Sequence, residues 1–309
     1  MPKPLDVLCI GHAAYDISGF VDHFPEENSK AETDQLLESG GGPAANAAYL
    51  LSRWKMNCAF AGLVGEDFYG LCIQKELAAV GTDLTLLELR QGHATPVSLI
   101  LINRQNGSRT LVNRKIKGPQ LSLSKECLAP FRPRVLLFDG HELEASLAAL
   151  SAYPTAISIL DAGSWREGTA TLAGKVDILA ASERFALQAT GLPDLHTEEH
   201  QRECIRLLRE RYPTRVIVTL GERGLLYDEG GGFHHLAAFP AQTVDTTAAG
   251  DIFHGALAYA VAQEIPFLAA LRFASMAASL SVRKVGGRGS IPTLSAVREA
   301  LILGEETKS

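Results

Sequence analysis

The sequence predicts an α/β protein with a mainly parallel sheet covered by helices on both faces, and with a small β-sheet lid. Two observations carry this prediction. Short apolar runs of strand type alternate with helical stretches over most of the chain, which is typical of parallel sheets connected by helices. The alternation is interrupted once, over residues 85–114, by three consecutive β-type runs. Strands without intervening helices do not belong to a parallel sheet, so this region indicates a second, smaller sheet.

Composition and charge narrow the class of protein. The chain has 309 residues, long enough to bury a large core, and 46% of them are hydrophobic. The net charge of −6 argues against a nucleic-acid partner, because phosphate backbones require clustered Lys and Arg. The five cysteines are odd in number and widely spaced, which favours reduced core thiols over disulfides or a metal site. The sequence shows neither a signal-peptide pattern nor an apolar run long enough for a membrane span, so we expect a cytoplasmic protein.

The first strand is expected at residues 5–11, an apolar run that ends in glycine. It delivers residues 12–16 to the carboxyl edge of the sheet, where ligands bind in open α/β folds. Asp16 could hold a polar ligand there, or it could be an ordinary turn aspartate.

A glycine turn comes next. Gly40, Gly41 and Gly42 precede Pro43, which describes a tight turn that enters an alanine-rich helix. Asn46 is the one polar side chain in the first turns of this helix. It either satisfies buried backbone groups or contacts the hydroxyls of a ligand.

A second strand over 58–65 and a helix from Glu66 to about residue 80 complete a βα step. The three β-type runs then follow at 85–90, 95–103 and 109–114, and Asn106-Gly107 is a strong hairpin signal between the last two. We assign the lid to residues 17–38 and 92–116, inserted in a single domain over 1–309.

The alternation resumes after the lid. Strands are expected at residues 134–139, 156–161, 176–181 and 214–220. Helices are expected at 142–151, 183–190 and 198–211. A hairpin over 224–239 precedes three final helices at 249–263, 266–284 and 293–303.

The stretch 244–259 places a carboxylate where a small-residue turn opens an apolar helix. The amides of a helix's first turn lack internal partners and attract anions. Asp251 at this point is either a catalytic base or, like Thr246, merely a helix N-cap. The local sequence leaves both readings open.

Two segments together resemble the signature regions of a known family. Gly41-Gly-Pro-Ala-Ala-Asn46 and Asp245-Thr-Thr-Ala-Ala-Gly-Asp251 are similar to those of the ribokinase-like, or phosphofructokinase-B, carbohydrate kinases. Their order and separation match, as does the segment 219–224. The resemblance covers nearly the whole chain. It implies a three-layer α/β/α sandwich and an ATP-dependent, Mg²⁺-using kinase that phosphorylates a sugar hydroxyl.

The resemblance also implies roles for individual residues. Asp251 takes the proton of the sugar hydroxyl, and the backbone amides of Ala248, Ala249 and Gly250 form an anion hole for the transferring phosphoryl group. The residues implied for sugar binding are Asp16, Gly41, Gly42 and Asn46, with Lys30 and Asn113 near the lid as further candidates. His141 ends a strand at the ligand edge and is either a sugar ligand or a structural histidine.

The same resemblance also implies which residues bind the nucleotide. Thr219, Gly221 and Gly224 match the segment that lies along ATP. Many relatives carry Asn-x-x-Glu where this chain has Ser182-Glu-Arg-Phe185, so Glu183 remains as the nearby carboxylate. Asp245 and the Thr247 carbonyl are implied as ligands of a monovalent cation, K⁺.

Alternatives remain open. A nucleoside kinase of the same superfamily would place an aromatic clamp in the lid, whereas residues 99–102 are aliphatic. A non-catalytic, sugar-binding regulatory protein is the reading from another class. The sequence favours a neutral sugar, since an anionic one would require Lys30, Arg104, Arg109 or Arg114 as partners. A homodimer through the lid strands is a further expectation.

Overall fold

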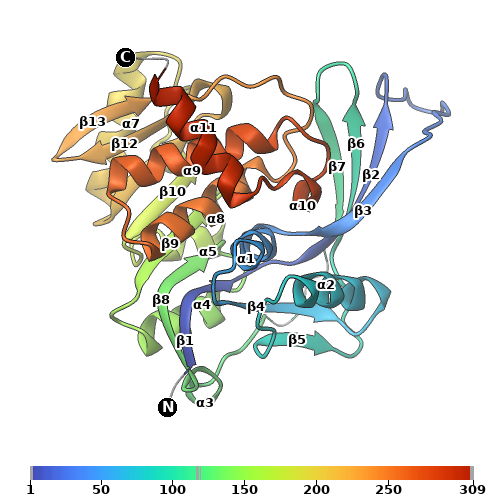
Figure 1. Ribbon diagram of the computed structural model, residues 1–309, viewed down its shortest axis with the longest axis horizontal. Helices are drawn as coiled ribbons and strands as arrows, with labels where there is room; N and C mark the ends of the chain where they lie inside the picture. The colour runs from blue at the N-terminus through green and yellow to red at the C-terminus, as the bar shows by residue number, and fades with distance from the viewer. Residues whose placement is uncertain (1–2, 116–117, 119, 307–309) are drawn as a thin grey trace.

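A nine-stranded sheet forms the centre of the computed structural model, which describes residues 3–115, 118 and 120–306 (Figure 1). The strand order is β13-β12-β11-β10-β9-β8-β1-β4-β5. Neighbouring strands are parallel from β11 to β5, and β12 and β13 add an antiparallel hairpin at one edge. The strands are β1 Lys3–Ile10, β4 Cys58–Gly65, β5 Leu87–Arg90, β8 Phe131–Phe138, β9 Ile157–Ala162, β10 Ile178–Ser182, β11 Arg215–Thr219, β12 Leu225–Glu229 and β13 Gly232–Leu236.

The strand order reverses between β1 and β8. From β1 the chain adds β4 and β5 on one side, and it then returns to add β8 to β13 on the other. Crossovers that leave in opposite directions open a crevice at the carboxyl ends of the two strands, and open α/β sheets bind ligands there. The fold therefore points to the residues that follow β1 and β8, which include His12 and Asp139.

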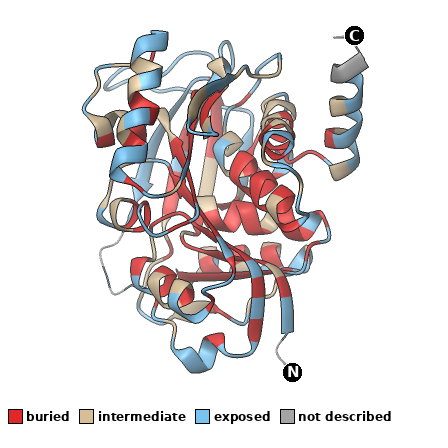
Figure 2. Ribbon diagram, turned by 90° about the vertical axis from the view of Figure 1, so that its left-hand side faces the viewer, coloured by how far each residue is buried: buried red, intermediate tan, exposed pale blue. Residues whose placement is uncertain are grey.

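Helices cover both faces of this sheet, as the sequence predicts. Buried side chains of α1, α2, α8, α9 and α11 pack on one face, and those of α3 to α7 pack on the other. Along β1 the alternation is direct, because Val7 and Cys9 join the first cluster and Leu8 and Ile10 the second. Figure 2 shows the result as a buried central layer between helices with exposed outer faces.

The helices have the following bounds: α1 Pro43–Arg53, α2 Phe68–Ala79, α3 Lys125–Leu128, α4 Leu143–Ala152, α5 Glu167–Leu172, α6 Glu183–Thr190, α7 Glu198–Arg211, α8 Ala249–Ala262, α9 Phe267–Ser281, α10 Gly287–Ser290 and α11 Leu294–Glu306, with a 3-10 turn at Gly221–Arg223. Across the described residues, no helix combines the length and the apolar character that a membrane crossing requires.

A four-stranded sheet projects from the side of the central one (Figure 1). Its order is β3-β2-β6-β7, with β2 and β6 parallel and the outer pairs antiparallel. A small core of Phe20, Ile100 and Ile102 holds it together. Its strands are β2 Ala14–Val21, β3 Leu36–Gly41, β6 Val97–Asn103 and β7 Arg109–Arg114.

The strands of this small sheet lie mostly within the predicted lid ranges, 17–38 and 92–116. The strands extend further toward the central sheet, to Ala14 and Gly41. Residue 116 lies outside the described residues. The predicted fold class, a mainly parallel sheet with a second small sheet, is confirmed.

Some local expectations were wrong. The run 85–90 was grouped with the other β-type runs of the lid region, but β5 pairs in parallel with β4 at the edge of the central sheet. It completes a β-α-β step after α2 and belongs to the parallel sheet, contrary to the expectation for consecutive strands without an intervening helix. The short helices α3, α5 and α10 were not predicted, because four to six residues carry little helical periodicity.

Candidate active site

Asp251 lies in the first turn of α8. Ala248 takes the N-cap position in the left-handed conformation, with φ of 60°, and no side chain caps this helix start within the described chain. The carboxylate of Asp251 instead accepts a hydrogen bond from Asn46 Nδ2 at 2.7 Å. Thr246 accepts a hydrogen bond from Arg109 at 3.2 Å. The helix-cap reading therefore fits neither Asp251 nor Thr246.

Burial raises the pKa of Asp251 to about 7, and the negative charge of Asp161 adds to the effect. The hydrogen bond from Asn46 and the charge of His254 act in the opposite direction. A carboxylate with this pKa exchanges its proton near neutral pH, which suits a general base.

His254 lies one helical turn after Asp251 and is buried. Its Nδ1 is 3.0 Å from Asp161 Oδ2, an ion-pair contact whose angle falls outside that of a hydrogen bond. Burial lowers the pKa of His254, but the nearby Asp161 and Asp251 carboxylates outweigh it and the net shift is upward. Neither Asp161 nor His254 was among the predicted site residues.

The glycine turn meets Asp16 closely. A Cβ on Gly41 would lie 2.0 Å from Asp16 Oδ2, and one on Gly42, whose φ is 94°, would lie 2.5 Å from the His12 carbonyl. Only glycine permits this approach. Burial raises the pKa of Asp16, although a hydrogen bond from Ser98 and the charge of Arg288 oppose the rise.

Asn46 is oriented by a second polar chain. Arg288, 3% exposed, donates from Nε to Asn46 Oδ1 at 3.2 Å and from Nη1 to Glu76 Oε2 at 2.7 Å. Because a guanidinium can only donate, the oxygen of the Asn46 amide must face Arg288. Its NH₂ group then faces Asp251. Glu76 also accepts from the amide of Gly40 at 2.9 Å, so the chain ends at the glycine turn.

Asp139, at the end of β8, ties the same region together. Its Oδ2 accepts from the amides of His12 at 2.8 Å and Ala44 at 3.1 Å, and its Oδ1 accepts from the amide of His141 at 2.9 Å. This buried carboxylate thus joins the ends of β1 and β8 to the first turn of α1. His141 stacks on His12 with ring centroids 4.4 Å apart.

The two lid candidates for sugar binding lie differently. Asn113 is opposite Ser98 on β6, and Ser98 is opposite Asp16 on β2, so these three residues form one row on one face of the small sheet. Lys30 is exposed in the segment between β2 and β3. The structure brings Asn113 into line with Asp16, and it does not bring Lys30 there.

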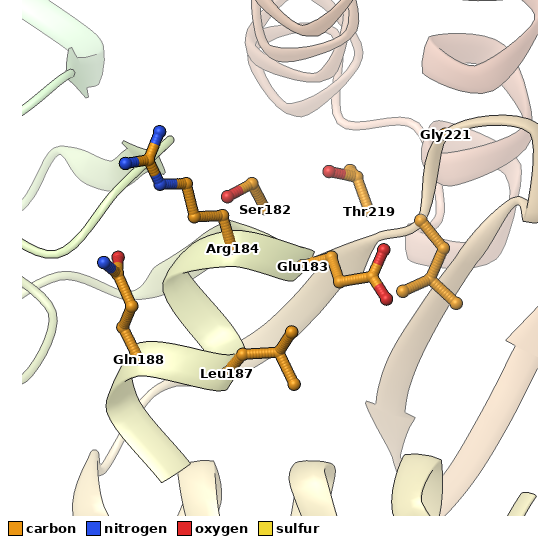
Figure 3. A pocket seen from close by; sticks show the side chains of 8 residues that line it. Ser182, Glu183, Arg184, Leu187, Gln188, Thr219 and Gly221 are labelled. Carbon is orange, nitrogen blue, oxygen red and sulfur yellow. The ribbon is translucent and has the colours of Figure 1, made fainter. Parts of the chain in front are cut away.

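On the nucleotide side, a hollow of about 700 Å³ lies beside α6 and the end of β11 (Figure 3). Thr219, Gly221 and Glu183 line it, as the resemblance implies. Gly224 is not part of the lining: its φ is 92°, and a Cβ there would lie 2.1 Å from the Leu236 carbonyl. Glu183 Oε1 is paired with Arg223 at 2.5 Å.

Asp245 is buried and accepts hydrogen bonds through both of its carboxylate oxygens. Its Oδ1 accepts from the amide and the hydroxyl of Thr247, at 2.8 and 2.7 Å, and its Oδ2 accepts from the amide of Gly286 at 2.8 Å. These bonds brace the turn that precedes α8 against the loop that carries Arg288.

Comparison with known proteins assigns the family. The family model described as pfkB family carbohydrate kinase matches residues 4–294. The chain belongs to the pfkB family of carbohydrate kinases. This pfkB family chain is 26% identical to a deoxyribokinase of Salmonella typhi, over 97% of this chain and 100% of the relative. It is 27% identical to a nucleoside kinase of Methanothermobacter thermautotrophicus, over 94% of each chain.

Solved structures agree with this pfkB family assignment. One from Agrobacterium tumefaciens, described provisionally as a ribokinase, is 30% identical with a TM-score of 0.87, over 98% of this chain and 99% of that one. The ribokinase of Arabidopsis thaliana, solved with ribose and ATP, is 24% identical with a TM-score of 0.81, over 96% and 98%. The prediction of a ribokinase-like carbohydrate kinase is confirmed.

Several residues of the site escaped sequence reasoning. Asp139 and Asp161 each stand at the end of an apolar strand, on the edge where ligands bind, and that position was the available signal. Arg288 and Glu76 gave no such signal, since 212 positions separate them in the chain.

Proposed function

We propose that this pfkB family kinase transfers the γ-phosphoryl group of ATP to a hydroxyl of a small sugar, with Asp251 as the general base. The observation that carries the proposal is the hydrogen bond of 2.7 Å between Asn46 and Asp251. This bond joins α1, which follows the glycine turn, to the uncapped first turn of α8. The residues proposed to bind the sugar therefore lie next to a helix start that can bind an anion.

In the proposed mechanism the amides of Ala248, Ala249 and Gly250 stabilise the charge on the transferring phosphoryl group. Phosphoryl transfer depends mainly on positioning and electrostatic stabilisation, which such a helix start supplies. Asp251 accepts the proton of the attacking hydroxyl. Asn46 holds the carboxylate in place, and Arg288 holds Asn46.

For the sugar we propose Asp16, the backbone of Gly41 and Gly42, and Asn46 as the central ligands. Asn113 supports this set through its row with Asp16, and His141 lies at the neighbouring strand end. Lys30 would reach the sugar only if its segment moved. A closing lid would supply that movement and would exclude water from the phosphoryl group.

For the nucleotide we propose the hollow beside α6, with Thr219, Gly221 and Glu183 along ATP. Gly224 contributes by shaping the turn into β12. Among the described residues, no group of three or more His, Cys, Asp or Glu side chains could cage a metal ion. Mg²⁺ would therefore arrive with the phosphates of ATP and neutralise part of their charge.

Potassium belongs to the proposal as well. Asp245 and the Thr247 carbonyl would hold the cation beside the turn that they already brace. The test is activity in K⁺ against an equal concentration of a large organic cation. Equal rates in the two would remove potassium from the mechanism.

A homodimer through the lid is supported by exposed apolar residues. Leu99 and Val112 lie opposite each other on β6 and β7 and are 53% and 65% exposed. Sedimentation velocity of the wild type and of Leu99→Asp tests this, since a dimer in the former and a monomer in the latter are expected. A monomeric wild type would contradict it.

The alternatives make different predictions for one assay, ATP turnover over a panel of sugars and nucleosides. A sugar kinase turns over sugars and loses the activity in Asp251→Asn. A nucleoside kinase prefers nucleosides. A non-catalytic binding protein binds a sugar without turnover, and equal turnover by the wild type and Asp251→Asn would refute the assignment of the base.

A further inference from the structure

Four nitrogen-bearing side chains gather beside the proposed sugar pocket. His12 follows β1, Lys115 follows β7, His141 follows β8 and Arg166 precedes α5. The rings of His12 and His141 stack at 4.4 Å with an angle of 18° between their planes. Arg166 Nη1 contacts His141 Nε2, and its Nη2 donates to Ser164 Oγ at 3.3 Å. We call these four residues the basic cluster.

The basic cluster has no anionic counterpart. Within the described residues, neither Arg166 nor Lys115 forms an ion pair with a carboxylate. The charge of Asp139 acts on Lys115, but three backbone amides already engage the oxygens of this carboxylate. Positive charge therefore collects here in a protein whose net charge is −6.

Burial and the neighbouring positive charges lower the pKa values of groups in the basic cluster. Burial and, to a smaller extent, the charges of Arg166 and Lys115 together lower the pKa of His141 to about 3. Burial lowers the pKa of Lys115 too, and Arg166 adds to the effect. An anion placed among these groups would favour their charged forms and would oppose both shifts.

The cluster is held rigidly. A Cβ on Gly168 would lie 2.0 Å from the Gly140 carbonyl, so the start of α5 packs directly against the loop that carries His141. The amide of His141 is fixed by Asp139. Arg166 and His141 are thus presented by backbone that cannot move apart without breaking this packing.

The cluster also borders the glycine turn. The carbonyl of His12 accepts a hydrogen bond from the amide of Ala45 at 3.3 Å, and a Cβ on Gly42 would lie 2.5 Å from the same carbonyl. A sugar held by Gly41, Gly42 and Asn46 would therefore have one end toward Asp251 and another toward the ends of β1 and β8.

We propose that the basic cluster is an anion-binding subsite, which takes a carboxylate, phosphate or sulfonate on the end of the sugar remote from the hydroxyl that is phosphorylated. This inference rests on the proposed function and narrows its substrate class. A neutral hydroxyl would satisfy hydrogen bonds but would leave two cations uncompensated, whereas an oxyanion does both.

The cations that the sequence suggested for an anionic sugar lie elsewhere. Arg104 is paired with Asp34, Arg109 donates to Thr246, and Arg114 donates to the Thr95 carbonyl. The sequence favoured a neutral sugar because Lys30 and these three arginines were the visible candidates, and Lys30 is exposed in the segment between β2 and β3. Because Arg166 and Lys115 lie beside the proposed sugar pocket, an anionic sugar now becomes the favoured substrate.

The test uses one carbon skeleton with and without the charge. Fructose is compared with its 6-phosphate, its 6-sulfonate analogue and its 6-carboxylate as acceptors for ATP, in the wild type, in Arg166→Gln and in the control Arg206→Gln. Arg206 is exposed on α7, within a surface network with Glu203 and Glu210, so the control removes the same charge far from the site. The circular dichroism and Tm of each variant report on folding.

We expect at least one anionic form to exceed fructose in kcat/KM by about 10-fold or more. Arg166→Gln should lower kcat/KM for that form by about 10- to 150-fold, mainly through KM, because a charge-assisted hydrogen bond is lost. The same variant should lower kcat/KM for fructose by a clearly smaller factor, because fructose carries no charge for Arg166 to bind. The anion that responds most distinguishes carboxylate, phosphate and sulfonate.

Other outcomes separate the two proposals. If fructose and all its anionic forms are phosphorylated equally well, or if Arg166→Gln affects them equally, the subsite is refuted and the kinase assignment stands. If no sugar is phosphorylated, the proposed function fails, and calorimetric titration of the same compounds without ATP decides the subsite alone. Binding of an anionic form that weakens in Arg166→Gln would support it, and binding without preference for charge would overturn it.

Discussion

The pH dependence of catalysis should respond in opposite directions to two buried neighbours of Asp251. The base must be ionised to accept a proton, and the pKa of Asp251 is raised to about 7. kcat/KM of the wild type, which reports on the free enzyme, should therefore rise with pH up to about 7 and then level off. We call this increase the rising limb of the pH profile. Replacing Asp161 by Asn removes a negative charge, which lowers the pKa of Asp251 and moves the rising limb to lower pH.

The size of the change follows from Coulomb's law. At about 6 Å, the outer end of the range over which a neighbouring charge shifts a pKa strongly, and at an effective dielectric constant of about 20, two unit charges interact by about 3 kcal/mol, or about 2 in pKa. Two effects reduce this figure. Asp251 keeps some exposure to solvent, and His254 loses part of its own stabilised charge once Asp161, 3.0 Å away, is neutral. We expect the limb to move down by about 1 pH unit in Asp161→Asn.

His254→Gln should act in the other direction. It removes a positive charge one helical turn from Asp251 and leaves Asp161 without its partner. Both changes disfavour the ionised form of Asp251, so the limb should move up, by about 1 pH unit on the same reasoning.

The assay is initial-rate kinetics between about pH 5.5 and 9 at saturating MgATP, with Asp194→Asn as the matched control. Asp194 lies next to His200, outside the proposed site, and is partly exposed. Limbs that move in the same direction in Asp161→Asn and His254→Gln, or that stay where they are, would refute the electrostatic account of Asp251.

Three further predictions concern the frame of the site. Asp251→Asn should lower kcat by about 10²- to 10⁴-fold while the KM for sugar changes little, as measured by steady-state kinetics. Gly41→Ala should raise the KM for sugar by about 10-fold or more at unchanged KM for ATP, since the new Cβ would meet Asp16 at 2.0 Å; an unchanged KM for sugar would contradict this. Arg288→Met should destabilise the fold by about 2 kcal/mol in thermal unfolding, below the usual cost of a broken buried pair because Glu76 is partly exposed. It should also lower kcat, because Asn46 loses its orienting donor; full activity would show that Asn46 is held by other means.

The sequence predicted those parts of the site whose residues are close together in the chain and form a recognisable local pattern. The turn at Gly41 and Gly42 and the turn before Asp251 each require particular small residues within a few positions, because backbone must approach other atoms closely. Such requirements can be recognised from the order of residues in the sequence alone. That the two turns serve one site was implied only by the resemblance to a family, and the direct contact between Asn46 and Asp251 was not predicted.

The remaining parts depend on which strands become neighbours. Arg288 meets Glu76 and Asn46 only after α10 has packed against α1 and β3, and His141 meets Arg166 only after β8 and β9 have paired. No local pattern in the sequence encodes these contacts between distant residues. The error at β5 has the same origin, since its place was set by pairing with β4 and not by its own composition.

Asp139 shows how the fold converts strand order into a site. The reversal of strand order leaves the ends of β1 and β8 side by side, and their amides would be unsatisfied there. One buried carboxylate accepts from both ends and from the first turn of α1. It thereby fixes the glycine turn on one side and the basic cluster on the other. In the proposed mechanism, the positions of the sugar's two ends would thus depend on a residue to which no part in the chemistry is assigned.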